Sequence, residues 1–162
     1  MTLEPRELER LDKRARNVLL YQLGRSMKTR YQLEQIMHKR EIPAEVFEPI
    51  LDRFTEAQLI DDEAFAKAFV SSRLNQRGKS LSAIRRELRQ KGVSDELIEA
   101  ATAEIDAAQE LEVAIEVAIN RNRRLSGLDD RTRRRRLTGL LQRRGFSGPV
   151  LSRALREAEA QG

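Results

Sequence analysis

The sequence predicts an all-α protein, an elongated tandem array of three three-helix repeats with about nine helices. Its composition favours helices, because 35% of the residues are charged and only 4% are aromatic. Strands draw instead on aromatic and β-branched residues. Apolar residues recur three and four positions apart along much of the chain, as they do on one face of an amphipathic helix. This pattern occurs three times, which indicates tandem repeats.

The repeat is visible when three parts of the chain are aligned. Residues 31–54 align with residues 82–105 at an offset of 51, and the latter align with residues 135–158 at an offset of 53. Five apolar positions coincide in the copies: Leu33, Ile84 and Leu137; Met37, Leu88 and Leu141; Ile42, Val93 and Phe146; Val46, Leu97 and Val150; and Phe47, Ile98 and Leu151. The first two positions are four residues apart, so they share one face of a helix.

A turn follows this helix in every copy. Gly92 and Gly145 occupy the same place in the second and third copies, where a helix commonly ends with one residue at positive φ. A second amphipathic helix follows, with Ser94 and Ser147 placed as its N-caps. In the first copy Glu41 replaces the glycine. If the copies are geometrically equivalent, Glu41 lies at positive φ, and otherwise the first helix ends in another way.

A further helix precedes each repeat. The apolar spacing predicts helices at about residues 7–24, 62–76 and 107–123. These helices complete three units, which we place at residues 1–60, 61–106 and 107–162. One such unit is too small to fold well alone. No linker rich in Pro, Gly or Ser separates the units, so we expect them to stack and share cores.

Charge is sorted along the chain. The net charge is +5 and the pI is near 10.0. Residues 77–91 contain six basic residues and one acidic residue, residues 93–120 contain eight acidic and no basic residues, and residues 121–144 contain ten arginines and two aspartates. Such blocks are expected where one face meets phosphate and another meets water or protein. We therefore expect a polyanionic partner.

Several classes of protein are excluded by what the sequence lacks. Without cysteine there is no disulfide, thiolate zinc site or cysteine catalysis. No apolar run approaches the roughly 18 residues of a membrane span, and the charged first residues are unlike a signal peptide. We expect a cytoplasmic monomer with no membrane partner.

No set of residues indicates catalysis. Asp61-Asp62-Glu63 has the composition of a magnesium ligand set, but an N-cap at Asp61 with acidic residues in the first helical turn explains it better. His38 is the only histidine, so no histidine pair or Ser-His-Asp set forms. A Walker-type phosphate loop is also lacking. We predict no catalytic residue, no metal, no cofactor and no enzymatic activity.

Two basic stretches are better functional candidates. In the helix that carries Ile84 and Leu88 on its apolar face, the basic residues fall on the remaining surface. Arg133–Arg136 are consecutive, and a helix turns about 100° per residue, so these side chains point all round it. If this helix starts near Asp130, the arginines crowd its positive end at a cost of a few tenths of a kcal/mol each. An anionic partner offsets that cost. With few aromatics nearby, we expect contacts to the nucleic-acid backbone that tolerate any sequence.

Three local patterns together resemble the RecX family. The first is Leu59-Ile60-Asp61-Asp62-Glu63-Ala64-Phe65-Ala66, followed by Phe69 and Arg73; the second is Gly78-Lys79-Ser80, then Ile84-Arg85-Arg86-Glu87-Leu88-Arg89-Gln90-Lys91-Gly92-Val93; the third is Arg134-Arg135-Arg136-Leu137, leading to Leu141-Gln142-Arg143-Arg144-Gly145-Phe146. Their order and triplication match the family over about residues 10–158. Glu41, in place of a turn glycine, departs from the pattern.

The resemblance implies a crescent of tandem three-helix units that binds the RecA recombinase. The expected partners are RecA and its nucleoprotein filament, in whose groove such proteins lie, together with weak, non-specific binding to single- or double-stranded DNA. The expected action is mainly inhibition of recombinase, ATPase and coprotease activities in DNA repair and the SOS response. We expect the partner and DNA contacts to come from Arg73, Lys79, Arg85, Arg86, Arg89, Lys91, Arg121, Arg124, Arg133, Arg134, Arg135, Arg136, Arg143 and Arg144.

A sequence-specific helix-turn-helix DNA-binding regulator is the alternative, because three-helix units with a turn can build that motif. Against it, the helices after Ile42 and Gly92 are mostly acidic, and acidic side chains repel phosphate.

Overall fold

The computed structural model describes residues 2–161, and every regular element in that range is helical. The helices are α1 (Pro5–Arg25), α2 (Arg30–Lys39), α3 (Ala44–Glu56), α4 (Asp62–Ser71), a π-helical turn η1 (Ser72–Gln76), α5 (Leu81–Gln90), α6 (Asp95–Thr102), α7 (Ala107–Arg124), α8 (Asp130–Arg143) and α9 (Gly148–Gln161). The predicted all-α array of three three-helix units is therefore confirmed. The helix predicted at residues 62–76 differs in one respect, since its last five residues form the wider π turn.

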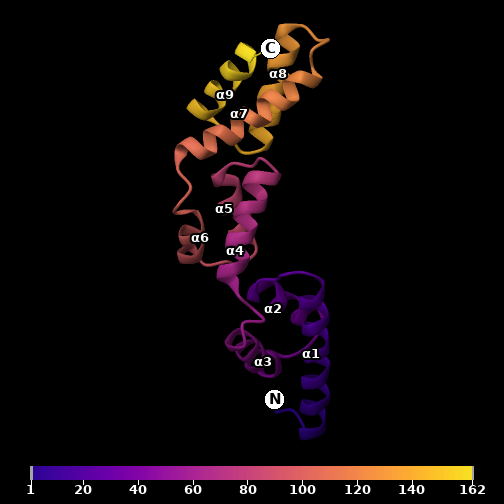
Figure 1. The fold of residues 1–162 in the computed structure, drawn as a ribbon. Coiled ribbons are helices and arrows are strands. Elements are labelled where there is room, and N and C mark those ends of the chain that lie inside the picture. Colours follow the sequence, from indigo (N-terminus) through magenta and orange to yellow (C-terminus); the bar gives the residue numbers. More distant parts are fainter. Residues whose placement is uncertain (1, 162) are drawn as a thin grey trace.

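The units follow one another along an elongated body, with α1–α3 at one end and α7–α9 at the other (Figure 1). Within each unit the first helix packs most extensively against the third, so α1 packs on α3, α4 on α6 and α7 on α9. The second helix of each unit contacts this pair less extensively.

Each unit has a hydrophobic core of its own. Leu33, Met37 and Phe47 lie in the first core, Ile84 and Leu88 in the second, and their repeat equivalents in the third. The expectation that stacked units share cores is thus largely wrong. A single side chain, the partly buried Val113, packs against both the second and third cores within the described residues. The neighbouring units are joined mainly by contacts outside these hydrophobic cores.

The turn after the second helix is the same in all three units. Glu41, Gly92 and Gly145 have φ values of 58°, 81° and 95°. The following apolar residue donates its N–H to a carbonyl five residues earlier in each case: Ile42 to Met37, Val93 to Leu88 and Phe146 to Leu141. This is the Schellman ending of a helix, in which one residue is left-handed. Of the two alternatives that the sequence left open for the first turn, the structure has the equivalent turn, with Glu41 at positive φ.

Glycine at two of these turns serves a second purpose, which is to admit the preceding unit. A Cβ atom on Gly92 would overlap the side chain of Tyr31, whose Cδ1 would be 2.8 Å away. A Cβ atom on Gly145 would overlap Ser80 and come within 2.8 Å of the Ala83 Cβ. Glu41 is exposed, since no earlier unit in the described chain packs on its turn.

The same turns receive hydrogen bonds from the preceding unit. The Thr29 hydroxyl donates to the Lys91 carbonyl (2.6 Å), and the repeat-equivalent Ser80 donates its N–H to the Arg144 carbonyl (2.9 Å). Thr29 and Ser80 are also the N-caps of α2 and α5. The start of one second helix is therefore fastened to the end of the next one. We call these two regions of contact, one between each pair of neighbouring units, the joints.

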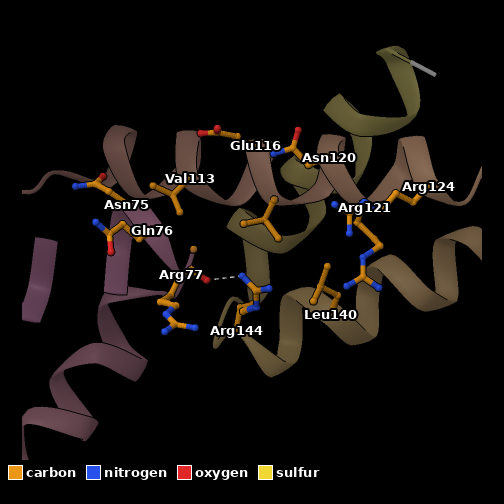
Figure 2. A pocket seen from close by; sticks show the side chains of 12 residues that line it. Asn75, Gln76, Arg77, Val113, Glu116, Asn120, Arg121, Arg124, Leu140 and Arg144 are labelled. Atoms are coloured by element: carbon orange, nitrogen blue, oxygen red, sulfur yellow. Dashed lines mark hydrogen bonds between the residues drawn. The ribbon is translucent and has the colours of Figure 1, made fainter. Parts of the chain in front are cut away.

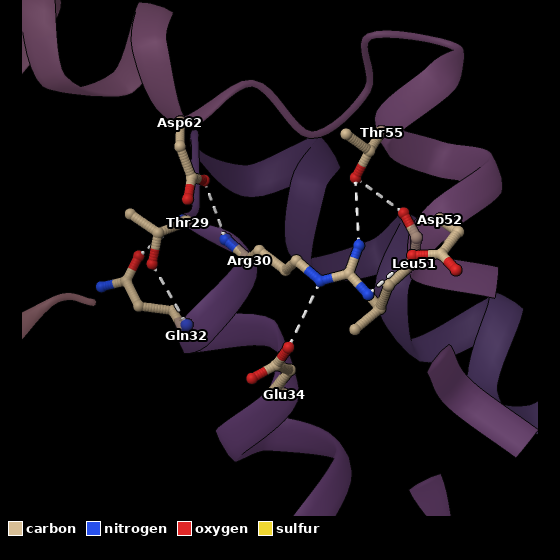
Figure 3. Close-up of polar contacts among 8 residues, drawn as sticks. All are labelled: Thr29, Arg30, Gln32, Glu34, Leu51, Asp52, Thr55 and Asp62. Carbon is tan, nitrogen blue, oxygen red and sulfur yellow. Dashed lines mark hydrogen bonds and ion pairs between the residues drawn. The ribbon is translucent and has the colours of Figure 1, made fainter. Parts of the chain in front are cut away.

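A carboxylate completes each joint. The Arg30 N–H, in the first turn of α2, donates to Asp62 of α4 (3.0 Å; Figure 3), and the equivalent Leu81 N–H of α5 donates to Glu110 of α7 (2.6 Å). Both donors lie at a helix N-terminus, where backbone N–H groups lack intrahelical partners and attract negative charge. The two joints thus use equivalent donors and the same chemistry.

The joints generate a prediction about glycine. Gly92→Ala introduces both positive-φ strain and overlap with Tyr31, so it should lower the free energy of unfolding by more than about 1 kcal/mol. Gly148→Ala is the matched control, since Gly148 has φ 56° but no atom lies near its added Cβ. Thermal melts should show a larger loss of stability for Gly92→Ala. Equal losses would mean that the joint does not require glycine.

Glu41→Gly should raise stability by up to about 1 kcal/mol, because it relieves positive φ without disturbing a joint. The same melts measure it, and a destabilised variant would show that the Glu41 side chain stabilises the first turn.

Leu88 tests the core of the second unit. Its side chain is fully buried, so Leu88→Ala should lower the free energy of unfolding by roughly 2–5 kcal/mol. Urea denaturation followed by circular dichroism provides the measurement. A decrease below about 1 kcal/mol would be inconsistent with a packed core at this position.

Candidate nucleic-acid interface

Part of the predicted basic surface is neutralised by one carboxylate. Glu87 of α5 forms ion pairs with Arg73 (3.2 Å) and with Lys79. Burial opposes ionisation of Glu87, but the hydrogen bonds from Lys79 and Arg73 outweigh it and lower the pKa of this carboxyl. Arg73 also lies over the Phe69 ring (4.5 Å), as does Lys91 (5.5 Å). These contacts stabilise the second unit, which makes these basic residues weaker candidates for a partner contact.

The remaining basic residues of α5 are more open. Arg86 is exposed. Arg89 pairs with the exposed Asp95 (3.3 Å), a kind of surface ion pair that contributes little to stability. Arg85 is half-buried and reaches the Thr102 hydroxyl at 3.5 Å. On this helix, Arg86 and Arg89 are therefore the most accessible to an anion.

The arginine run lies at the N-terminal part of α8, which starts at Asp130, so the condition stated for these arginines is met. Arg133 pairs with Asp130, and Arg134 lies 3.5 Å from Glu159 of α9. Arg135 and Arg136 are exposed, and so is Arg143 near the other end of the helix. The run is therefore only half compensated by acidic residues.

Asp129 caps this helix by accepting a hydrogen bond from the Thr132 N–H (2.9 Å). The hydrogen bonds from Thr132, with smaller contributions from Arg135 and Arg133, lower the pKa of this carboxyl. Asp129 therefore remains ionised and partly offsets the arginines at the positive end of the helix.

A cleft of about 300 Å³ lies between the second and third units (Figure 2). It is lined by the end of η1 and the next loop (Asn75, Gln76, Arg77, Gly78), by α7 (Val113, Glu116, Val117, Asn120, Arg121, Arg124), and by Leu140 and Arg144. The cleft brings together three predicted site residues, Arg121, Arg124 and Arg144, although Arg144 comes from a different part of the third unit. The other predicted residues lie outside it.

Arg77 is a cleft residue that the sequence-based site did not include. Its carbonyl accepts a hydrogen bond from the Arg144 guanidinium, and the two residues face each other in Figure 2. The adjacent Gly78 has φ 62°, and an added Cβ would lie 2.5 Å from Val117 and 3.0 Å from Arg144. Gly78 followed by the N-cap Ser80 was the available sequence signal, because a glycine there marks a close approach of backbone.

Asp61, Asp62 and Glu63 do not form a ligand set. Asp61 caps α4 through the Ala64 N–H (3.0 Å), as predicted, and Glu63 pairs with Lys67. Asp62 belongs to the joint; burial raises its pKa, partly opposed by the hydrogen bond from the Arg30 backbone. Across residues 2–161 no three His, Cys, Asp or Glu side chains are arranged to hold a metal ion.

His38 packs edge-on against Phe47, with ring centroids 5.2 Å apart. This exposed side chain therefore makes a packing contact with α3. Among the described helices, none is both long and apolar enough to cross a membrane.

Arg30 is a further residue that sequence patterns did not single out. Its guanidinium contacts Glu34 (3.3 Å) in its own helix and Asp52 (2.8 Å) and Thr55 (3.5 Å) in α3, while its backbone N–H binds Asp62 (Figure 3). One residue thus ties α2 to α3 and to the second unit. Most of its partners are distant in the sequence, so the spacing of residues along the chain does not predict them.

Comparison with known proteins agrees with this architecture. Three family models match in order: the first, second and third three-helix domains of RecX, at residues 15–54, 61–101 and 108–155. The chain is also similar in fold to the crystal structure of RecX from Lactobacillus salivarius, with a TM-score of 0.77 and 21% identity over 94% of this chain and 99% of that one. Another crystal structure of a regulatory protein RecX gives a TM-score of 0.76 at 27% identity over 95% of this chain and 80% of that one.

Curated relatives are similar along most of their length. The regulatory protein RecX of Streptomyces coelicolor is 44% identical over 89% of this chain and 77% of its own. That of Thermobifida fusca is 42% identical over 95% of this chain and 84% of its own. These relatives are named regulatory proteins, which points to a non-enzymatic role. With three consecutive domain matches and this identity over most of its length, the chain belongs to the RecX family of regulatory proteins.

Proposed function

We propose that the protein binds RecA and RecA–DNA filaments and mainly inhibits the recombinase, ATPase and coprotease activities of RecA in DNA repair. The observation that carries this proposal is the ordered match of all three domains to RecX, together with relatives named regulatory protein RecX. We further propose that the units divide at residues 60 and 106, and that the protein acts in the cytoplasm as a monomer.

The geometry supports a role on a nucleoprotein filament. An elongated array presents neighbouring units to successive subunits of a partner more readily than a sphere does. Exposed arginines lie on α8 and on the outer face of α5, where Arg86, Arg135 and Arg136 are open to solvent. Such residues suit DNA phosphate or an acidic protein surface. Direct DNA contact is expected to be weak and indifferent to sequence.

Inhibition of RecA is the direct test. Added to purified RecA, ATP and single-stranded DNA, the protein should lower ATP turnover at substoichiometric to stoichiometric ratios. It should hydrolyse no ATP when RecA is omitted. Unchanged turnover and filament lifetime over a wide titration would contradict the proposed function.

DNA binding tests the role of the α8 arginines. Binding should be on the order of micromolar or weaker near physiological salt and should weaken steeply as salt rises. Replacing Arg133–Arg136 with Gln should weaken it for all sequences alike. The salt slope for duplex DNA should fall by about 0.9 for each phosphate that is no longer neutralised.

A matched control removes four charges from the first unit. Arg6, Arg10, Lys13 and Arg14 are exposed on α1, and their replacement with Gln should change affinity much less. An equal loss of DNA affinity in the two variants would show that binding depends on the net charge of the protein and not on the arginines of α8. Salt-insensitive binding to one preferred sequence would favour the helix-turn-helix alternative instead.

A further inference from the structure

The cleft between the second and third units draws its positive charge from both of them. Arg77 belongs to the second unit, whereas Arg121, Arg124 and Arg144 belong to the third. Among the described residues that line it, Glu116 is the one carboxylate, so four cations face a single anion. Neither unit by itself carries the complete set.

These four arginines differ from Arg73 and Lys79 in their partners. Arg73 and Lys79 share Glu87, but no ion pair found among residues 2–161 includes an arginine of the cleft. Like charges gathered in a partly enclosed space repel one another more strongly than in open water. A bound anion removes that repulsion.

We propose that this cleft binds the phosphate backbone of a nucleic acid, and that a bound strand holds the second and third units at the angle seen in this structure. The proposal deepens the DNA contact of the proposed function and rests on it. A guanidinium binds phosphate oxygens through two parallel hydrogen bonds. The side-chain amides of Asn75, Gln76 and Asn120 add neutral donors on the wall. The wall, as far as the structure describes it, contains no aromatic ring, so bases have nothing to stack on and binding is independent of sequence.

The coupling to the joint follows from two close contacts. The Arg144 guanidinium donates to the Arg77 backbone carbonyl across the joint, which holds Arg144 beside the loop that carries Arg77 (Figure 2). Gly78 allows its loop to approach Val117 of α7 at a distance that no side chain would permit. A change of angle between the units moves Arg77 relative to the other three arginines, so a strand whose phosphates are bound by residues of both units opposes that change.

Binding to the cleft is tested with the full chain in the absence of RecA, so the result does not depend on whether RecA is inhibited. Fluorescence anisotropy of labelled oligothymidylate measures affinity against salt for Arg121→Gln with Arg124→Gln. These two side chains take no part in the hydrogen bonds that form the joint, and circular dichroism verifies the fold. We expect at least about fivefold weaker binding, and a salt slope that falls by about 1.4 when two phosphates are no longer neutralised.

The matched control is Arg153→Gln with Arg156→Gln, which removes the same charge from exposed positions on α9. It should retain nearly wild-type affinity, and an equal decrease in the control would overturn the assignment to the cleft. Inorganic tripolyphosphate serves as the competitor. Weak displacement, explained by ionic strength alone, supports a nucleic-acid site; stoichiometric displacement that depends on Arg121 and Arg124 would instead make it a site for free polyphosphate.

The angle is tested with labels on two introduced cysteines, since the chain has none of its own. Glu99→Cys on α6 and Ser152→Cys on α9 are exposed positions in the second and third units. Oligothymidylate should narrow the distance distribution between spin labels, and Arg121→Gln with Arg124→Gln should abolish the narrowing. An unchanged distance distribution at saturating oligonucleotide would contradict the proposal that a bound strand fixes the angle between the units.

Discussion

The architecture depends on how the end of the second helix in the second and third units fits against the preceding unit. Each second helix ends in a left-handed residue, and at Gly92 and Gly145 the missing side chain leaves space for the preceding unit. Thr29 and Ser80 approach these turns as N-caps that also bind them. Because the cores are separate, these polar joints, with Asp62 and Glu110 as acceptors, determine how the units are arranged. The first turn belongs to no joint, which explains why Glu41 is tolerated there.

The basic residues fall into two groups, those that form ion pairs within a unit and those that are left without a carboxylate partner among the described residues. Inside the second unit, Glu87 neutralises Arg73 and Lys79, and Phe69 packs beneath a guanidinium, so charge there contributes to the fold. On α8 and across the second joint the arginines exceed the available carboxylates. Positive charge is therefore concentrated where the second and third units meet and where α8 begins, and these are the surfaces that we propose for contact with a polyanion.

The features that could be predicted from the sequence are those that recur in the three repeats and those that depend on neighbouring residues in the chain. Apolar spacing identified the helices, and the aligned turns gave positive φ at Glu41 as one of two alternatives. Cap rules identified Asp61 and Ser94, whose side chains accept from the expected N–H groups. The sequence did not predict that the cores are separate, because periodicity identifies a buried face without identifying what covers it. Nor did the sequence distinguish Arg73 and Lys79, which pair with Glu87, from the arginines that form no ion pair in the part of the chain that the structure describes. It also did not place Arg77 in the cleft. Both features depend on tertiary packing. The repeat of Thr29 at Ser80 was a usable signal for the joint.

Small-angle scattering of Gly145→Ala tests most directly whether the glycine turns determine the arrangement of the units. An added Cβ there overlaps Ser80 and Ala83 of the preceding unit, whereas in Gly148→Ala, three residues further on, it meets no neighbouring atom. If the turns determine the arrangement, Gly145→Ala has a changed distribution of interatomic distances with its helix content retained, and Gly148→Ala has an unchanged one. Identical scattering from Gly145→Ala and the unaltered protein would contradict this dependence.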